Sequence, residues 1–322
     1  MVIIVSTNDE PSTDEVLKWL KYFNVPFLRI NETDIVSIKE ILLMDGKVDI
    51  LFEFSETEII SSKDITAYWY RRGFININNL YETLRSVYSD AILQFINQER
   101  FKISEFFDYF FKTNYKSIGS MANADLNKIS VLFEAAKLGL KIPNTLISQY
   151  KSSVYKFSKS AQHSLITKSI SNSFVYRNEN ENISHGTDLI SHQKLERKSE
   201  VMNVGLFQNN IEKLFEIRSF FLHGKYYSMA IFSQKAENTK TDFRNYNFEK
   251  PNRTAPYRLP QEIENKLTEL MHLLSLNTGS IDMIYGTDNS YYFLEINPVG
   301  QFGMLSYPCN YYLEKRIAEY LT

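Results

Sequence analysis

The sequence predicts an α/β protein in which a β-α-β unit is followed by sheets built largely from hairpins. The first 30 residues contain a β-branched run, an apolar helical stripe and a second apolar run, which is typical of a parallel β-α-β unit. Later apolar runs flank turn-forming clusters at His223–Lys225 and Gly286–Ser290, as in antiparallel hairpins. A length of 322 residues allows two or three domains with sizeable cores.

The composition is that of an ordinary globular protein, with 43% hydrophobic and 23% charged residues. A formal net charge of −2 gives no sign of a nucleic acid or membrane partner. No apolar stretch is long enough to span a bilayer, and the apolar run at the start is too short for a signal peptide. The single cysteine, Cys309, excludes an internal disulfide, and we expect a cytoplasmic location.

The opening unit consists of a strand over Val2–Ser6, a helix, and a strand over Phe27–Ile30. Ser12 and Glu15 have the spacing of a capping box, which predicts that the helix begins beside Ser12. No glycine-rich loop follows the first strand, so we do not expect a Rossmann dinucleotide site.

The rest of the N-terminal part contains predicted strands at 51–54 and 58–60 and a long predicted helix over 80–114. Between them, an aromatic strand ends in Arg71 and Arg72. Arginines at a strand end can bind a carboxylate or phosphate in a bidentate manner. Solvated surface cations are the alternative interpretation.

Two lysines in the middle of the chain are candidates for phosphate binding. Lys128 lies at the start of a predicted helix over 127–138, and Lys168 ends the apolar run that begins at Leu165. A lysine that leaves an apolar strand can act as a compact charge against phosphate oxygens, whereas a solvated helix lysine is the plainer explanation of Lys128. Residues 169–174 contain no glycine, so a glycine-rich phosphate lid is not expected, and the polar segment 174–200 is predicted to include a hairpin.

A further hairpin is predicted from Phe215–Leu222 and Tyr226–Phe232. Side chains alternate between the faces of a strand, so Glu216 and Arg218 share a face. A cross-strand ion pair is one explanation of Arg218. Helices are predicted over 260–276 and 304–321.

The hairpin from Ser280 to Pro298 combines apolar runs with acids. Glu295 and Asn297 project from one face of the second strand, and Asp282 on the first strand can lie opposite them. Two carboxylates and an amide oxygen suit Mg²⁺, which keeps positions for water and substrate phosphates. An edge hairpin with solvated acids is the alternative, but acids in such an apolar run are costly to bury without a partner.

This spacing resembles the metal site of the ATP-grasp ligases, where an acid on one strand and a Glu-x-Asn on the next hold the magnesium ions of ATP. The resemblance implies ATP and Mg²⁺ as cofactors, with Asp282, Glu295 and Asn297 as metal ligands. Asn209 stands where many members of the family have an acid. The resemblance also implies catalytic contacts by Arg218 and nucleotide contacts by Lys128, Lys168, Gln208, Asn209, Ile211, Lys213 and Glu216.

Two stretches resemble the peptide-modifying graspetide synthetases, namely Tyr68–Gly73 and Asn297–Gly303. Asp242 and Arg244 belong to an Asp-Phe-Arg motif that these enzymes share with ligases adding glutamate to a protein tail. The resemblance implies that Arg244 stabilises the acyl phosphate and its tetrahedral intermediate. It also implies a ribosomally made precursor peptide as partner, a leader-binding insertion within 174–200, a homodimer, and substrate contacts by Arg71, Arg72 and Asp242.

The resemblance therefore implies an ATP-grasp fold in three parts. These are an N-terminal pre-ATP-grasp domain over 1–115, a central lid subdomain with the peptide-binding insertion over 116–205, and a C-terminal sheet subdomain with the metal site over 206–322. The first functional hypothesis is a maturase that joins Asp or Glu side chains of a precursor peptide to Thr, Ser or Lys side chains. A ligase that adds free amino acids to a protein tail or small acid is the second. A non-catalytic nucleotide-binding or peptide-binding protein is the third.

Overall fold

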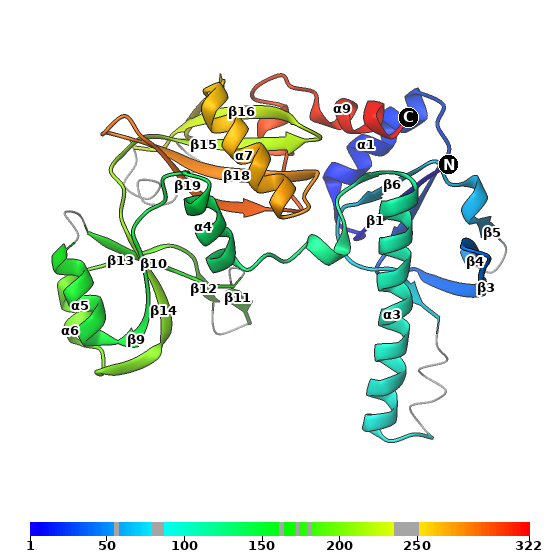
Figure 1. Ribbon diagram of the computed structural model, residues 1–322, viewed down its shortest axis with the longest axis horizontal. Helices are drawn as coiled ribbons and strands as arrows, with labels where there is room; N and C mark the ends of the chain where they lie inside the picture. The colour runs from blue at the N-terminus through cyan, green and yellow to red at the C-terminus, as the bar shows by residue number, and fades with distance from the viewer. Residues whose placement is uncertain (55–57, 79–86, 161–163, 172–173, 179–181, 235–250) are drawn as a thin grey trace.

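The computed structural model describes residues 1–322 except 55–57, 79–86, 161–163, 172–173, 179–181 and 235–250. It is an α/β structure with three main groups of elements, each built around a sheet (Figure 1). Among the described residues, no helix combines the length and the apolar character that crossing a membrane requires.

The N-terminal sheet has four parallel strands in the order β2-β1-β6-β8. The strands are β1 (Val2–Ser6), β2 (Phe27–Asn31), β6 (Ala67–Tyr70) and β8 (Lys116–Ile118). Helix α1 (Pro11–Tyr22) connects β1 to β2, which confirms the predicted β-α-β unit. The predicted capping box is wrong: α1 begins at Pro11, so Ser12 lies within its first turn, and its hydroxyl donates to Glu10 instead.

A second four-stranded sheet, in the order β5-β4-β3-β7, shares a core with the first. Its strands are β3 (Ile35–Met44), β4 (Lys47–Phe54), β5 (Glu58–Ser61) and β7 (Asn76–Ile77). Strand β3 is not predicted from the sequence, because its exposed apolar residues disguise the alternation of a strand. The long helix α3 (Asp90–Asn114) begins ten residues later than predicted, because Val87–Ser89 are not helical and 79–86 lie outside the described residues.

The central sheet is antiparallel, in the order β13-β10-β14-β9. Its strands are β9 (Thr145–Tyr150), β10 (Leu165–Lys168), β13 (Asp188–Ile190) and β14 (Val201–Asn209). Helices α5 (Lys151–Ser160) and α6 (His192–Glu196) pack on this sheet, and Val154, Leu195 and Phe207 are in its core. The predicted hairpin within 174–200 is present as β11 (Phe174–Arg177) paired with β12 (Asn182–His185).

The C-terminal sheet has five antiparallel strands in the order β17-β16-β15-β18-β19. They are β15 (Lys213–Leu222), β16 (Lys225–Phe232), β17 (Arg253–Tyr257), β18 (Thr278–Gly286) and β19 (Tyr291–Asn297). Both predicted hairpins are confirmed. Helices α4 (Lys128–Lys137) and α7 (Gln261–Leu273) cover one face of this sheet, where Ile217, Ile281 and Ile296 are buried (Figure 1).

The other face of the C-terminal sheet changes character along its strands. At one end, Phe220 and Leu222 join a core that includes α1 and the N-terminal sheet. Towards the other end, the same face of β15 carries Arg218 and Glu216. The apolar half of this face therefore packs against α1 and the N-terminal sheet, and the other half carries charged side chains.

The C-terminal segment forms two helices, α8 (Gly303–Ser306) and α9 (Leu313–Leu321). The prediction of one helix over 304–321 is wrong, because Pro308 lacks a backbone donor and Asn310 and Tyr312 adopt positive φ angles of 53° and 52°. Helix α9 packs against α1 and completes the core beneath the N-terminal sheet (Figure 1).

Candidate active site

Three charged residues form a row across adjacent strands of the C-terminal sheet. Arg218 on β15 pairs in register with Asp282 on β18, and Asp282 pairs with Glu295 on β19. The extra residue of an irregularity in β19 falls between Phe293 and Glu295, and it sets this register. Adjacent strands lie about 4.8 Å apart, so the three side chains are close neighbours. Arg218 Nη1 lies 3.4 Å from Asp282 Oδ2, and both side chains are almost fully buried.

Lys128 continues this row beyond Glu295. It is the first residue of α4, whose N-terminus is capped by the Asn127 side chain accepting from the amides of Ile129 and Ser130. Lys128 Nζ lies 3.7 Å from Glu295 Oε2 and donates to the Ser171 carbonyl at 2.8 Å. One basic side chain therefore lies at each end of the acidic pair, and Lys128 also reaches the loop that comes after β10.

Asn297 lies two residues beyond Glu295, with Ile296 between them buried on the opposite face. Its side chain is exposed, and its Oδ1 accepts from the Gly300 amide at 3.1 Å. An amide oxygen has a second lone pair and can accept again. In the described part of the chain, no three His, Cys, Asp or Glu side chains lie close enough together to hold a metal ion by themselves. The donor set of two carboxylates and one amide nevertheless fits Mg²⁺, which needs few protein ligands.

A cleft of about 670 Å³, including its open mouth, separates the central and C-terminal sheets. Strands β10 and β14 border it on one side, and β15, β18 and β19 border it on the other. The cleft brings together eight of the residues predicted to contact the nucleotide or metal, namely Lys168, Gln208, Asn209, Ile211, Lys213, Glu216, Asp282 and Glu295.

The far end of the cleft offers polar groups suited to a purine. The Gln208 side-chain amide donates to Thr145 Oγ1, while Gln208 Oε1 and Asn209 Oδ1 are buried acceptors without a hydrogen-bond partner among the described residues. Buried acceptors of this kind are costly unless a ligand satisfies them. Lys213 and Glu216 form a buried ion pair beside them. These groups can receive the amino edge of a nucleotide base.

Arg71 is placed differently from the prediction that it contacts substrate. Only 1% of the residue is exposed, and its guanidinium donates to the carbonyls of Val299 and Gly300 and to Glu10. Buried and bonded to other parts of the chain, it is not presented to a substrate. Arg72 remains partly exposed, with its Nε 2.7 Å from Glu10 Oε2.

Two predicted residues, Asp242 and Arg244, lie outside the described residues. Apolar residues that were not predicted from the sequence also line the cleft, including Ile166, Ile284 and Leu294. Strand alternation could have predicted Ile166, because Ile166 and Lys168 lie on the same face of β10.

No protein-family model matches the sequence, and no curated protein matches it significantly. Solved structures do match. A Chryseobacterium gregarium RiPP-associated ATP-grasp ligase, in complex with ADP and a leader and core peptide, is 26% identical with a TM-score of 0.81, and 99% of this chain and 94% of that chain are covered.

Two macrocyclases from Microcystis aeruginosa are also similar. MdnC, bound with precursor peptide MdnA, is 27% identical with a TM-score of 0.78, covering 100% of this chain and 99% of that chain. MdnB shares the fold at 18% identity with a TM-score of 0.71 and the same coverage of 100% and 99%. Because the likeness spans essentially the whole of each chain, the protein is an ATP-grasp ligase that resembles RiPP-associated members of that superfamily, which confirms the fold and the resemblance predicted from the sequence.

Proposed function

We propose that this protein is an ATP-dependent maturase that joins side chains within a ribosomally made precursor peptide. The observation that carries the proposal is the acidic pair Asp282 and Glu295, flanked by Arg218 and Lys128 at a cleft between two sheets. The peptide substrate is supported by the two similar structures above 25% identity, both of which contain bound peptides.

ATP would occupy the cleft with its base towards Gln208 and Asn209 and its phosphates towards Lys168 and Lys128. Lysine and arginine side chains balance phosphate charge in such sites. Asp282, Glu295 and Asn297 would hold Mg²⁺. When bound, the metal ion neutralises charge on the phosphate oxygens.

The chemistry is a consequence of this arrangement. An oxygen of an Asp or Glu carboxylate in the peptide attacks the γ-phosphorus of ATP, the bond to the β-phosphate oxygen breaks, and an acyl phosphate and ADP result. A Thr or Ser hydroxyl, or a Lys amine, then attacks the acyl carbon and releases phosphate, leaving an ester or an amide. Arg218, which lies beside Asp282, would stabilise the charge that develops on the transferred phosphoryl group. Arg244 is proposed to stabilise the tetrahedral intermediate.

We also retain the remaining sequence-based expectations as parts of the proposal. Arg72 and Asp242 would contact the substrate peptide, and the insertion within 174–200 would bind its leader. Residues 1–115, 116–205 and 206–322 would form the three domains. The family resemblance supports a homodimer. The single cysteine, which is buried, supports a cytoplasmic location.

A ligase that adds free amino acids to a protein tail or small acid is less well supported. Its particular signal was the motif of Asp242 and Arg244, which lie outside the described residues. A non-catalytic binding protein would have no need for both acids of the row and a cation at each end of it.

Mass spectrometry tests the proposal. A Thr- and Glu-rich peptide encoded beside this gene is incubated with the protein, ATP and Mg²⁺, and the expected result is loss of one water mass per ring, dependent on ATP. Changes in the outer shell of a metal site already cost about 10- to 100-fold, so Glu295→Gln should lower the rate by about 100-fold or more.

Glu262→Gln is the matched control, because Glu262 forms only an exposed pair with Lys266 on α7. It should leave the rate unchanged. An unmodified peptide mass, with ADP release only when free amino acids are added, would instead favour the second function. Full activity of Glu295→Gln would overturn the metal assignment.

A further inference from the structure

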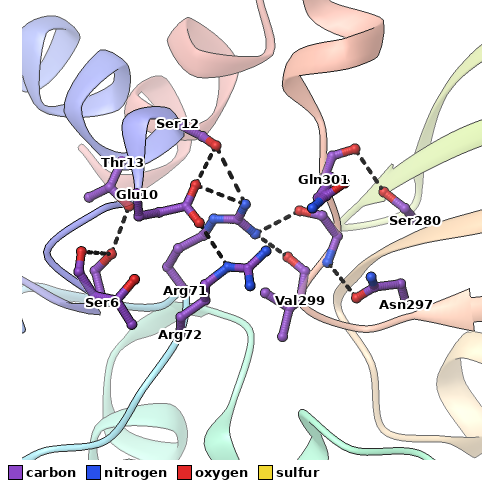
Figure 2. A network of polar contacts seen from close by, with 12 residues as sticks. Ser6, Glu10, Ser12, Thr13, Arg71, Arg72, Ser280, Asn297, Val299 and Gln301 are labelled. Carbon is purple, nitrogen blue, oxygen red and sulfur yellow. Dashed lines mark hydrogen bonds and ion pairs between the residues drawn. The ribbon is translucent and has the colours of Figure 1, made fainter. Parts of the chain in front are cut away.

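Arg71, immediately after strand β6, is among the largest fully buried side chains of the described residues. Its Nη1 donates to the carbonyls of Val299 and Gly300 at 2.5 and 2.6 Å, and its Nη2 donates to Glu10 Oε1 at 3.2 Å. Figure 2 shows this guanidinium between Glu10 on one side and the turn after β19 on the other. Its central carbon also lies 5.3 Å from the ring centre of Phe302.

The turn that Arg71 holds begins at Asn297, one of the proposed metal ligands. The Gly300 amide donates to Asn297 Oδ1, and the Gly300 carbonyl is one of the two that accept from Arg71. Gly300 has a φ of +60°, which favours glycine. From the other side, the Ser280 hydroxyl donates to the Gln301 carbonyl at 3.3 Å. A continuous path of bonds therefore runs from Arg71 through Gly300 to the Asn297 amide.

Glu10 is the group that fixes the orientation of Arg71. The residue is 7% exposed, and its carboxylate accepts from Arg71 and Ser12 and lies 2.7 Å from Arg72 Nε. The carboxylate comes from the residue that precedes α1, at the same edge of the N-terminal sheet as Arg71. Burial lowers the pKa of the Arg71 guanidinium, and the charge of Glu10 opposes that shift.

A buried ion pair is a weak source of stability, because desolvating two charges offsets most of their attraction. An apolar contact would join the N-terminal sheet to this turn at less cost. The charged pair instead supplies two directed donors to two successive carbonyls, which fixes the turn in one conformation. The benefit of such a device is geometric precision at the end of β19.

We propose that Glu10 and Arg71 are positioning residues for the metal site, acting through the turn to orient the side-chain amide of Asn297. The inference rests on the proposed function, because it takes Asn297 as a ligand of the ATP-bound metal ion. It assigns to the N-terminal sheet a role in metal binding, although its own residues do not reach the metal ligands directly.

The test measures binding of Mn²⁺, as a probe for Mg²⁺, to the full-length protein with a non-hydrolysable ATP analogue, by electron paramagnetic resonance. Outer-shell changes weaken metal binding by about 10- to 100-fold. We expect Glu10→Gln and Arg71→Lys to weaken Mn²⁺ binding by about tenfold, while the affinity for the analogue without metal stays within twofold of wild type. Asp14→Asn is the control, because Asp14 on α1 pairs with Arg29 on β2, and among the described residues neither of them has a hydrogen bond to the turn.

A double-mutant cycle separates positioning from general loss of stability. If Glu10 acts through Asn297, then Glu10→Gln should weaken Mn²⁺ binding no further in an Asn297→Ala background. Equal losses in both backgrounds would overturn the inference. So would Mn²⁺ affinities within twofold of wild type in folded Glu10→Gln and Arg71→Lys variants.

Failure of the positioning inference alone and failure of the proposed function give different patterns of Mn²⁺ binding. If Asn297→Ala leaves Mn²⁺ affinity unchanged while Glu295→Gln abolishes it, the metal site stands and only the positioning inference fails. If the wild-type protein binds no Mn²⁺ with the analogue, both fail together.

Discussion

Each acidic side chain bordering the cleft lies beside a basic one. Arg218 neighbours Asp282, and Lys128 neighbours Glu295. Such neighbours lessen the cost of partly burying the acids when no ligand is present. Under the proposed function, the same cations would turn to phosphate oxygens while the carboxylates turn to the metal ion. The row therefore suits both the empty and the loaded cleft.

The Glu10 carboxyl gives a pH-dependent prediction. Burial raises its pKa, but the hydrogen bond from Ser12 and the charges of Arg71 and Arg72 outweigh burial and hold it below the ordinary value of 4.5. A carboxyl with a lowered folded-state pKa stabilises the protein above its unfolded pKa, and that stability is lost as the pH falls through the folded value. We expect Glu10→Gln to lower the free energy of unfolding by about 1–3 kcal/mol at pH 7.

Urea unfolding between pH 7 and pH 3 measures this difference. The difference in unfolding free energy between wild type and Glu10→Gln should stay constant above about pH 5 and become smaller below pH 4.5. Asp14→Asn removes the exposed ion pair between Asp14 on α1 and Arg29. This variant should lose no more than about 1 kcal/mol of unfolding free energy. A gap that stays unchanged at pH 3 would contradict the role given to the ionised Glu10.

At the level of elements, strand β19 and the turn after it act together. The side chains of β19 alternate between a core face with Ile296 and a polar face with Glu295 and Asn297. The turn is held from both sides, by Ser280 of β18 and by Arg71. The end of β19 is therefore held in place, as the proposed role of Asn297 as a metal ligand requires.

Gly300 tests the rigidity of this turn. A Cβ at Gly300 would lie 3.1 Å from the Ser280 backbone nitrogen, whereas a Cβ at Gly224 would meet nothing within 4 Å. Both glycines have positive φ, +60° and +82°, so alanine at either costs about 1–2 kcal/mol of backbone strain. Gly300→Ala should lose more unfolding free energy than Gly224→Ala in urea titrations, because the backbone of β18 cannot move aside. Equal losses would indicate that the turn yields.

In the molecule as a whole, strands of the central and C-terminal sheets line the cleft. The N-terminal sheet packs against the other end of the C-terminal sheet (Figure 1). Lys128 already joins the two sides of the cleft through Glu295 and the Ser171 carbonyl. A nucleotide in the cleft would contact both sheets and so couple them. Binding to the native state alone stabilises a protein by about 2.7 kcal/mol at a ligand concentration of 100 Kd.

Hydrogen exchange can detect this coupling. With a non-hydrolysable ATP analogue and Mg²⁺, amides of β10, β14 and β18 should exchange more slowly, whereas those of α3 should not change. Glu295→Gln should remove the part of the protection that depends on Mg²⁺. Protection confined to the N-terminal sheet would place the nucleotide elsewhere.

Sequence patterns predicted much of this arrangement because alternation is a local property. They gave the hairpin of β18 and β19, the shared face of Glu295 and Asn297, and the strand ending in Lys168, and the resemblance supplied their roles. Sequence patterns predicted helix boundaries less reliably where the direction of the chain changes. The breaks around Pro308 and before α3 depend on backbone conformations that a helical pattern does not record.

Only the tertiary structure decided what each charged side chain meets. In the sequence, the paired arginines Arg71 and Arg72 are typical of an anion-binding site. In the structure, Arg71 is buried and donates to a carbonyl 228 residues further along the chain. Likewise, the row of Arg218, Asp282 and Glu295 depends on the register of three strands. A sequence by itself determines which face of an element is polar, because side-chain direction is set by local geometry. Packing between distant segments decides which polar groups are brought together. In this protein, such packing forms both the cleft and the contact of Arg71 with the turn after β19.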